Sequence, residues 1–222
     1  MTTRIAGGIT RAETTAETIR ADILTGRYLS GERLIEIKIA EALAVSQNTV
    51  RDALRILEHE GWVIKQPRRG VYVRTFSAAD AAEVCALIAA IETVALEATI
   101  RVLDRVLRAE MNGMIAAARK ASYNADWHQA YEHLLRFHIR IGTAANRPLT
   151  AQLLESLYNQ VRLIESLRMA RSPRSADDLT GQIDANERLL RLMEAGSTEA
   201  ACQHLRDQLT IYTSETLDAL RM

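Results

Sequence analysis

Cysteine is scarce in this 222-residue chain, which has only Cys85 and Cys202, far apart in the sequence. A small scaffold held together by disulfides is therefore excluded, and we expect both thiols to be reduced and buried. No stretch approaches the roughly 18 consecutive apolar residues that cross a bilayer, so we expect no membrane partner. The first eight residues lack the apolar segment of a secretory signal, and we expect a cytoplasmic protein.

Proline and aromatic residues are also few, with three prolines, two phenylalanines and two tryptophans. So few prolines leave long stretches free to form helices, and abundant Ala, Leu, Glu and Arg favour a mostly helical fold. Hydrophobic residues (48%) and charged residues (25%) have the proportions of an ordinary globular protein, which excludes disorder. The net charge is zero, so a DNA-binding function would have to be indicated by a local pattern.

Glycine and charge are unevenly distributed along the chain. Residues 1–76 contain six of the ten glycines, and twelve Lys and Arg against nine Asp and Glu. Residues 77–222 contain sixteen Lys and Arg against nineteen Asp and Glu, so a slightly basic part precedes a slightly acidic one. Ser77 and Asp80 have the spacing of a capping box, which predicts that a long helix begins there. We therefore expect two domains, 1–76 and 77–222.

Three helices are predicted in the first domain. The first begins at a capping box of Thr10 and Glu13. A second, short helix over residues 37–43 is followed by a tight turn at 44–45, after which Ser46 caps a third helix. The apolar residues of each helix recur at a spacing of three or four, which predicts one buried face. These buried faces consist of Ala16, Ile19 and Ile23; Ile39, Ala40 and Leu43; and Val50, Ala53, Leu54 and Leu57.

Two short β runs follow the third helix, over residues 62–64 and 71–73. The segment between them, residues 67–70, has the sequence PRRG and predicts the turn of a β-hairpin. Helix, turn, helix and hairpin in this order predict a winged helix–turn–helix domain.

The second domain shows helical periodicity and no strand pattern. Asn146 to Pro148 and Gly196 provide breaks between helices. The fold class is therefore mainly α, with the winged helix–turn–helix joined to an all-helical bundle of about six helices. We expect these helices over residues 78–102, 103–121, 126–144, 149–170, 177–195 and 198–220.

The third helix of the first domain is suited to a DNA major groove. Since its apolar stripe is committed to the core, Gln47, Asn48, Arg51 and Arg55 lie on the opposite face. Gln and Asn can form two hydrogen bonds to adenine, and Arg can do so with guanine. A merely solvated polar face is the alternative, but the ordered set of turn, capped helix, hairpin and basic tip favours DNA binding.

Phosphate contacts are expected at the free N–H groups of the helix start and at the two arginines of the hairpin tip, where a glycine permits close approach. The predicted DNA-binding residues are Ser46, Gln47, Asn48, Thr49, Arg51, Arg55, Arg68, Arg69 and Gly70.

These motifs together resemble the winged helix–turn–helix head of GntR-type transcription regulators. The resemblance rests on residues 30–34 (SGERL), 39–41 (IAE), 45–46 (VS), 50–51 (VR), 53–54 (AL), Leu57, Gly61 and 67–70 (PRRG). In that family, the positions of Thr49 and Arg51 contact DNA. Gln47 stands where an arginine is usual, Asn48 where a threonine is common and Thr49 where a proline is common, so the family's base preference does not carry over to Gln47.

The second domain is similar to the helical effector domain of the FadR subgroup, called the FCD domain. The matching residues are Phe137, His138, 144–146 (AAN), Leu149, Ala195 and Gly196. The resemblance implies a homodimer that binds a short inverted repeat in double-stranded DNA, and whose second domain binds a small molecule, commonly an organic acid. It implies no enzymatic activity, and the chain shows no nucleophile motif or Gly-rich phosphate loop.

Many relatives bind a divalent metal through one Asp and three His. The resemblance places these ligands at Leu134, His138, Asn186 and Gln208, so one of the four remains. A transition-metal site needs three or more His or carboxylate ligands. We therefore predict no metal and no other cofactor.

The same positions predict an effector cavity instead. Leu134 and His138 share one helical face, as do His204 and Gln208. A cavity arginine of the relatives is replaced by Ile88, which predicts a less acidic ligand than usual. The predicted effector-binding residues are Leu134, His138, Asn186, His204 and Gln208. The alternative is that these side chains satisfy one another around water.

The sequence thus predicts a sequence-specific transcription regulator, by family analogy a repressor, whose DNA affinity is controlled by a small metabolite. The alternative is a ligand-independent DNA-binding architectural or interaction factor with a degenerate pocket.

Overall fold

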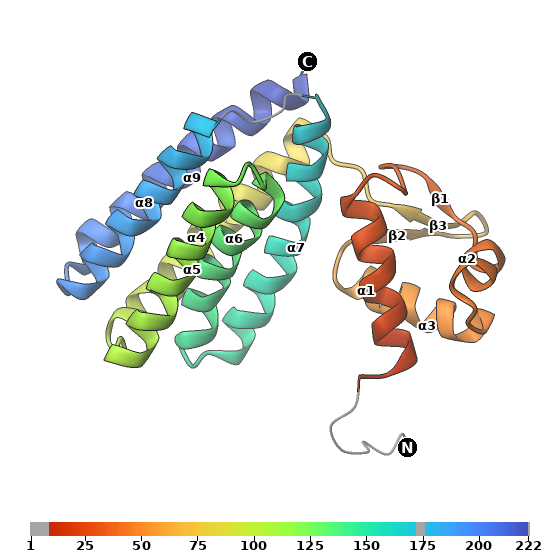
Figure 1. Cartoon of the computed structure of the whole chain (residues 1–222), viewed down its shortest axis with the longest axis horizontal. Helices are drawn as coiled ribbons and strands as arrows, with labels where there is room; N and C mark the ends of the chain where they lie inside the picture. The colour runs from red at the N-terminus through yellow and green to blue at the C-terminus, as the bar shows by residue number, and fades with distance from the viewer. Residues whose placement is uncertain (1–8, 172–175, 222) are drawn as a thin grey trace. The chain divides into compact units, whose positions relative to one another are not determined.

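The computed structural model describes residues 9–171 and 176–221, and the chain divides into two compact units at Phe76 and Ser77 (Figure 1). The first eight residues, for which no secretory signal is expected, lie outside the described residues. Within the described part the protein is mostly helical, with one small sheet in the first unit. None of the described helices combines the length and the apolar character that a bilayer crossing demands.

The first unit contains three helices and three short strands. In chain order they are α1 (Arg11–Leu24), β1 (Arg33–Leu34), α2 (Glu36–Leu43), α3 (Gln47–His59), β2 (Val63–Gln66) and β3 (Gly70–Val73). α1 and α2 both pack against α3. The predicted capping box of α1 is confirmed, because the Thr10 hydroxyl accepts a hydrogen bond from the Glu13 amide at 3.1 Å. The predicted apolar stripes are buried, except that Leu43 is only half-buried.

The turn between α2 and α3 depends on one left-handed residue. Ala44 has φ of 52° and ends α2, and the amide of Val45 then reaches back to the Ala40 carbonyl. This tight turn brings Ser46 directly to the start of α3, where its hydroxyl accepts from the Thr49 amide at 3.1 Å. The predicted helix–turn–helix and its serine cap are therefore confirmed.

The sheet has the order β1-β3-β2, with both pairs antiparallel. The predicted hairpin corresponds to β2 and β3, in which Val63 pairs with Val73 and Gln66 with Gly70. The sequence did not predict β1, because a two-residue strand is too short to show alternation. Its Leu34 is buried, which anchors the segment before α2 to the wing.

The second unit contains six described helices, as predicted. They are α4 (Ala78–Ile100), α5 (Arg105–Tyr123), α6 (Trp127–Ala144), α7 (Pro148–Arg171), α8 (Ala176–Glu194) and α9 (Thr198–Arg221). The predicted capping box at Ser77 and Asp80 starts α4. α5 begins two residues later than predicted, because the Asp104 side chain accepts from the Leu107 amide at 2.8 Å and caps the helix there.

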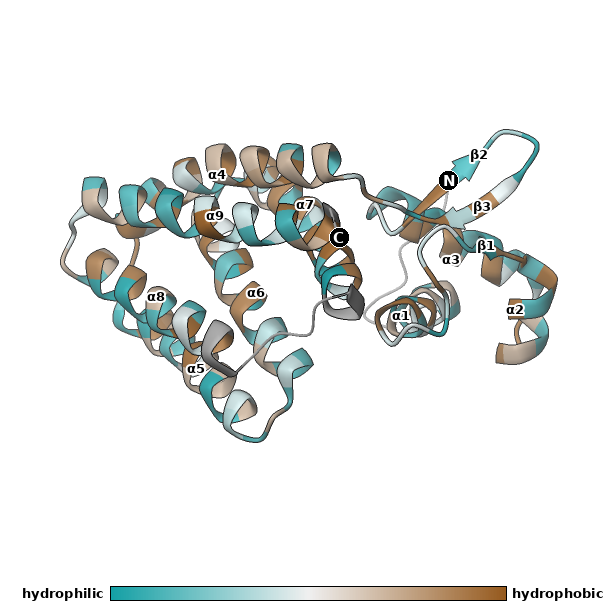
Figure 2. Ribbon diagram, turned by 90° about the horizontal axis from the view of Figure 1, so that it is seen from above, coloured by the Kyte–Doolittle hydropathy of each residue, from teal (hydrophilic) through white to brown (hydrophobic). Residues whose placement is uncertain are grey.

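α4 packs against α6, α7 and α9, while α6 also packs against α5, α7 and α8, and α5 packs against α8. In Figure 2, teal and brown alternate along α5 and α8, whereas α4 is coloured mostly tan and brown. Cys85 and Cys202 are both buried and free, as expected. Gly142 marks a close approach of α6 to α7, since a Cβ there would lie 2.8 Å from the Leu154 Cδ1.

Candidate DNA-binding face and effector cavity

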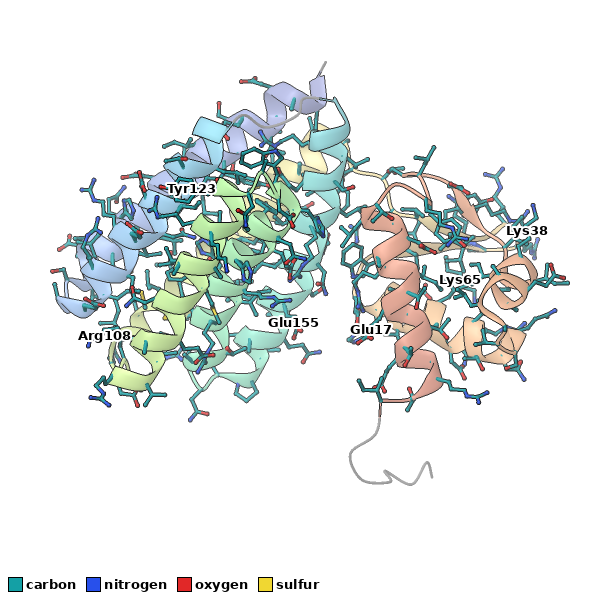
Figure 3. All side chains as sticks on the ribbon, in the orientation of Figure 1. Glu17, Lys38, Lys65, Arg108, Tyr123 and Glu155 are labelled. Carbon is teal, nitrogen blue, oxygen red and sulfur yellow. The ribbon has the colours of Figure 1, made fainter. Side chains whose placement is uncertain are left out.

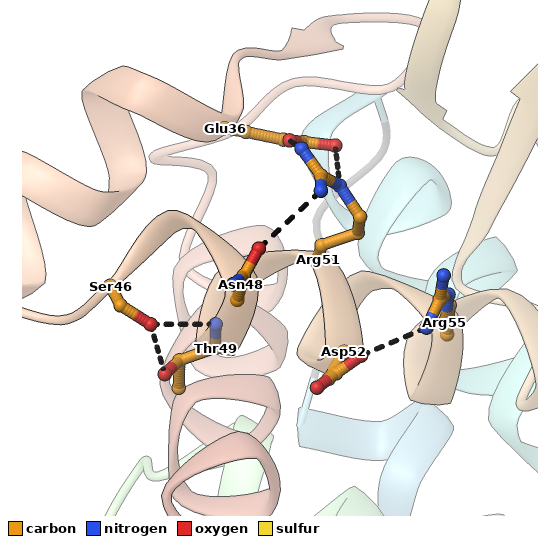
Figure 4. Close-up of polar contacts among 7 residues, drawn as sticks. All are labelled: Glu36, Ser46, Asn48, Thr49, Arg51, Asp52 and Arg55. Carbon is orange, nitrogen blue, oxygen red and sulfur yellow. Dashed lines mark hydrogen bonds and ion pairs between the residues drawn. The ribbon is translucent and has the colours of Figure 1, made fainter.

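The outer face of α3 presents the polar residues that the sequence placed there. Gln47, Asn48, Arg51 and Arg55 are exposed, while the other side of the helix is buried in the core. Ser46 and Thr49 are committed to each other, because their hydroxyl oxygens lie 2.8 Å apart (Figure 4). These two side chains start the helix and orient its first N–H groups.

Arg51 is held by a carboxylate that the sequence analysis missed. Its guanidinium donates to Glu36 at the start of α2, with Nη2 at 2.8 Å and Nε at 3.4 Å (Figure 4). This hydrogen bonding raises the pKa of Arg51, which is charged in any case. Glu36 and Arg51 are 15 residues apart, so the pairing becomes visible only when the turn folds α2 against α3. Asn48 lies beside the same guanidinium at 3.5 Å.

Arg55 lies one turn further along α3 and pairs with Asp52 at 3.0 Å. Both side chains are well exposed, so this pair contributes little to stability and opens easily. Arg55 therefore remains available to a phosphate.

The hairpin tip carries cations without acidic partners. Among the described residues, no carboxylate lies within ion-pair distance of Arg68 or Arg69, and both are exposed. Gly70 has φ of +113°, and a Cβ there would meet the Arg33 Nε at 3.0 Å. Gly70 therefore leaves room for Arg33, a third cation of the wing that the sequence analysis missed, and its predicted close approach to DNA stays a prediction.

Two lysines extend this basic surface. Lys65 lies on β2 next to the tip, and Lys38 projects from α2 into solvent in Figure 3. Neither has an acidic partner within the described part of the chain. The first unit thus combines a polar helix face with several cations left available for an anionic partner.

The second unit contains a cavity of about 380 Å³. Five of its six helices contribute lining residues, which come from α4, α6, α7, α8 and α9. Four of the five predicted effector-binding residues line it, namely Leu134, His138, Asn186 and Gln208. His204 does not: its Nε2 lies 2.8 Å from the Ala185 carbonyl oxygen, so this ring joins α9 to α8 outside the cavity.

His138 belongs to a buried polar cluster that the sequence analysis missed. Its Nδ1 lies 2.7 Å from the Glu92 carboxylate, which is fully buried and also accepts a hydrogen bond from the Tyr158 hydroxyl. Burial, together with Glu92, raises the pKa of Tyr158, so its hydroxyl stays protonated and donates. Glu92 falls at a core position of α4, one turn after Ile88, and this acidic residue within an apolar stripe was the available signal.

Two more tyrosines, Tyr131 and Tyr212, also line the cavity. Tyr131 donates to the Tyr212 hydroxyl at 3.2 Å, and Tyr212 donates to Glu165 at 3.4 Å. Glu165 is buried and ion-paired with Arg168 at 3.1 Å. These residues are spread over α6, α7 and α9, so no local spacing could have grouped them.

Asn186 and Gln208 form a third polar pair, with the Gln208 amide donating to the Asn186 oxygen at 3.1 Å. The Gln208 Oε1 atom is buried without a hydrogen-bond partner. A buried acceptor that is left unsatisfied destabilises the protein, and a ligand N–H or O–H would relieve that cost.

The residues around His138 do not fit a metal ion. Nowhere in the described ranges do three His, Cys, Asp or Glu side chains come together with metal-binding geometry. Glu92 and His138 bond to each other, and Leu134, Asn186 and Gln208 occupy the other three positions at which the family resemblance places metal ligands. Leucine cannot coordinate a metal, and amides are poor ligands for transition metals.

Comparison with known families identifies both units. Residues 11–73 match the model described as "Bacterial regulatory proteins, gntR family", and residues 83–210 match the FCD domain. The chain belongs to the GntR family of transcription regulators, with an FCD domain. The resemblance seen in the sequence is therefore confirmed, and the family consists of DNA-binding regulators and not of enzymes. GntR regulators bind DNA, and FCD domains bind small-molecule effectors.

Relatives support the same assignment. The chain is 25% identical to the uncharacterized HTH-type transcriptional regulator YdhC of Bacillus subtilis, over 82% of this chain and 80% of that protein. A crystal structure of a GntR transcriptional regulator from Rhodococcus sp. RHA1 is 27% identical, with a TM-score of 0.79, and covers 94% of this chain and 98% of that one. McbR/YncC of E. coli shares the fold at 19% identity, with a TM-score of 0.80 over 95% of this chain and 98% of that one.

Proposed function

We propose that this GntR regulator is a repressor that recognises a short inverted repeat as a homodimer and is controlled by a small molecule in the cavity of its second unit. The observation that carries the proposal is the cavity itself, which residues of five helices line and to which His138, Asn186 and Gln208 contribute polar groups. A ligand that binds one arrangement of the two DNA-binding units better than another would shift DNA affinity. Repression is proposed as the sign because it is the commoner role in the family.

The geometry of α3 supports base contacts by Gln47, Asn48 and Arg51. These side chains are exposed near the helix start, where recognition helices meet base edges. Glu36 holds two of the Arg51 nitrogens and leaves Nη1 directed toward Asn48. A guanidinium fixed in this way is already oriented for a base or phosphate.

The wing supports phosphate contacts. Arg68 adopts φ of 63°, a left-handed conformation that costs an ordinary side chain about 1 kcal/mol relative to glycine. An arginine kept at a strained position, exposed and without an acidic partner in the described residues, is suited to an external anion. Arg69 lies next to it, and Arg33 packs over Gly70.

A homodimer is supported by the surface of α4. This helix is apolar on nearly all sides, and its Leu87 and Val94 are both 45% exposed. Ala86 and Ala90 are exposed beside them. An apolar stripe of this kind favours burial against a second copy.

The DNA proposal is tested by selecting bound duplexes from a random pool with the full-length protein. We expect a palindromic consensus with half-sites about one helical turn apart. Leu87→Glu with Val94→Glu should give monomers in sedimentation and lose the palindromic preference. A non-palindromic consensus, or unchanged dimers in that variant, would contradict the proposed assembly.

The effector proposal is tested by filling the cavity. Gly181 lines the cavity at an exposed position, and a Cβ added there meets no atom within 4 Å, so Gly181→Leu introduces a bulky side chain at the cavity wall. Gly113→Leu on the exposed surface of α5 is the matched control, since its Cβ is equally unobstructed. A metabolite at 100 times its dissociation constant should stabilise the wild type and the control by about 2.7 kcal/mol, but not Gly181→Leu. Repressor and activator are separated by transcription in vitro from a promoter that overlaps the selected site.

A further inference from the structure

The charged groups at the cavity are predominantly acidic. Of the described residues that line it, none is Lys or Arg, and Glu215 carries a carboxylate. Glu92 lies behind His138, and Glu165 lies behind Tyr212. An anionic ligand would therefore meet three carboxylates near the walls, and His138, itself bonded to Glu92, would be the lining group able to carry positive charge.

The Arg168 guanidinium, which pairs with Glu165 and Glu215, does not compensate for all of these charges. The side chain of Arg168 is 7% exposed, and Arg168 is not among the lining residues. Its Nε and Nη2 donate to Glu165 at 3.1 and 3.3 Å, and its Nη1 lies 3.9 Å from Glu215. One cation is thus shared between two carboxylates, and the Glu215 carboxylate is held at a distance longer than a hydrogen bond.

The hydroxyl protons at the cavity are committed as well. Tyr158 donates to Glu92, Tyr131 to Tyr212, and Tyr212 to Glu165. Gln208 donates one amide hydrogen to the Asn186 oxygen, while its Oε1 atom lacks a partner. The tyrosine hydroxyl oxygens and the Gln208 Oε1 are therefore left as acceptors, and a ligand that carries N–H donors is their complementary partner.

We propose that the cavity binds a hydrophobic amine, with the ammonium group at Glu215 and a second N–H donor at the Gln208 Oε1. This identifies the ligand class of the regulatory site and rests on the proposed function. The two acceptors are seven residues apart on α9, about 10 Å along the helix axis. Apolar side chains also line the cavity and suit an aromatic or aliphatic body: Ile88, Leu134, Leu135, Val161 and Leu209. The organic acid implied by the family resemblance is the class that this cavity disfavours.

Three probes with one indole body test the proposal: tryptamine, tryptophol and indole-3-propionate. They present an ammonium, a hydroxyl and a carboxylate, and binding is measured by calorimetry with the full-length protein. We expect tryptamine to bind at least tenfold more tightly than indole-3-propionate, with tryptophol in between. 1-Methyltryptamine, which lacks the ring N–H, should bind several-fold more weakly than tryptamine, because the Gln208 Oε1 again lacks a donor.

Glu215→Gln should remove the preference for the ammonium and leave tryptophol binding within twofold of the wild type. Glu155→Gln is the matched control, because Glu155 is exposed on α7 and does not line the cavity (Figure 3). Circular dichroism and melting temperature establish that each variant is folded.

Equal or tighter binding of the carboxylate would overturn the proposal, and so would absence of binding by all three probes. An unchanged ammonium preference in Glu215→Gln would do the same. The proposed regulation has a separate test. It is contradicted if every ligand that stabilises the wild type, whatever its class, stabilises Gly181→Leu equally. A carboxylate whose stabilisation of the wild type disappears in Gly181→Leu would thus overturn the amine and preserve the regulatory site.

Discussion

The two candidate binding surfaces of this chain differ in where their cations lie. On the first unit, Arg68, Arg69 and Lys65 are exposed at the wing without acidic partners among the described residues. At the cavity of the second unit, Arg168 is buried and shared between Glu165 and Glu215. A net charge of zero over the whole chain therefore conceals one surface suited to an anion and one suited to a cation.

The surfaces also differ in what their polar groups do in the absence of a partner. Glu36 and Arg51 form an exposed pair, with side chains 33% and 49% accessible, which water can replace at little cost. Glu92 is fully buried, and its partners His138 and Tyr158 have little access to water. The polar groups of the cavity therefore contribute to folding as well as to binding, while those of the DNA face are available for binding alone.

The largest effect on stability is expected when the buried Glu92 carboxylate is removed. Glu92→Ala should lower the free energy of unfolding by about 3 kcal/mol, because it leaves the buried Tyr158 hydroxyl and the His138 ring without their partner. Denaturant titration measures the change. Glu97→Ala, at an exposed position of the same helix, should change the stability by less than about 0.5 kcal/mol. Equal effects in the two variants would show that the cluster is not structural.

The next largest effect is expected for the DNA affinity of an Arg51 variant. Arg51→Ala should weaken specific DNA binding by about 1–3 kcal/mol without unfolding the protein, because an exposed side chain that contacts a base or phosphate is lost. Fluorescence anisotropy with the selected duplex measures the loss. Wild-type affinity in the folded variant would remove Arg51 from the DNA-binding set.

Replacement of Arg68 and Arg69 together should weaken binding to selected and scrambled duplexes alike. Each lost phosphate contact should reduce the slope of log affinity against log salt by about 0.9. Anisotropy over a series of salt concentrations gives this slope. A loss confined to the selected sequence would assign base reading to the wing.

The smallest effect is expected for Glu36→Gln. Because the ion pair with Arg51 is exposed, the free energy of unfolding should change by less than about 1 kcal/mol. Thermal and denaturant melts detect a change of this size. A loss as large as that expected for Glu92→Ala would mean that the DNA face, like the cavity, is held together by its polar groups.

The comparison also explains what could be predicted from the sequence. The polar face of α3 was predictable, since the periodicity of Val50, Ala53, Leu54 and Leu57 determines which side faces the core. The pairing of Arg51 with Glu36 was not, because it depends on the angle between two helices. The family resemblance located four cavity residues, but His204 shares a helical face with Gln208 and still bonds to Ala185. A shared helical face, inferred from a spacing of one turn, does not determine whether a side chain lies inside or outside a cavity.

The grouping of the tyrosines and glutamates at the cavity was even harder to predict from sequence spacing. Tyr131, Tyr158 and Tyr212 come from three helices, and nothing in their spacing indicates that their hydroxyls approach two buried carboxylates. Only Glu92 was detectable in principle, because it interrupts an apolar stripe.

Linkage between the two surfaces tests the central claim most directly. The affinity of the full-length protein for its selected duplex is measured with and without saturating tryptamine, and the affinity for tryptamine is measured with and without the duplex. The two measurements must change by the same factor, and we expect at least fivefold in the wild type and in Gly113→Leu, and no change in Gly181→Leu. Identical tryptamine affinity for the free and the DNA-bound protein would contradict control of the DNA-binding unit by an amine in the cavity.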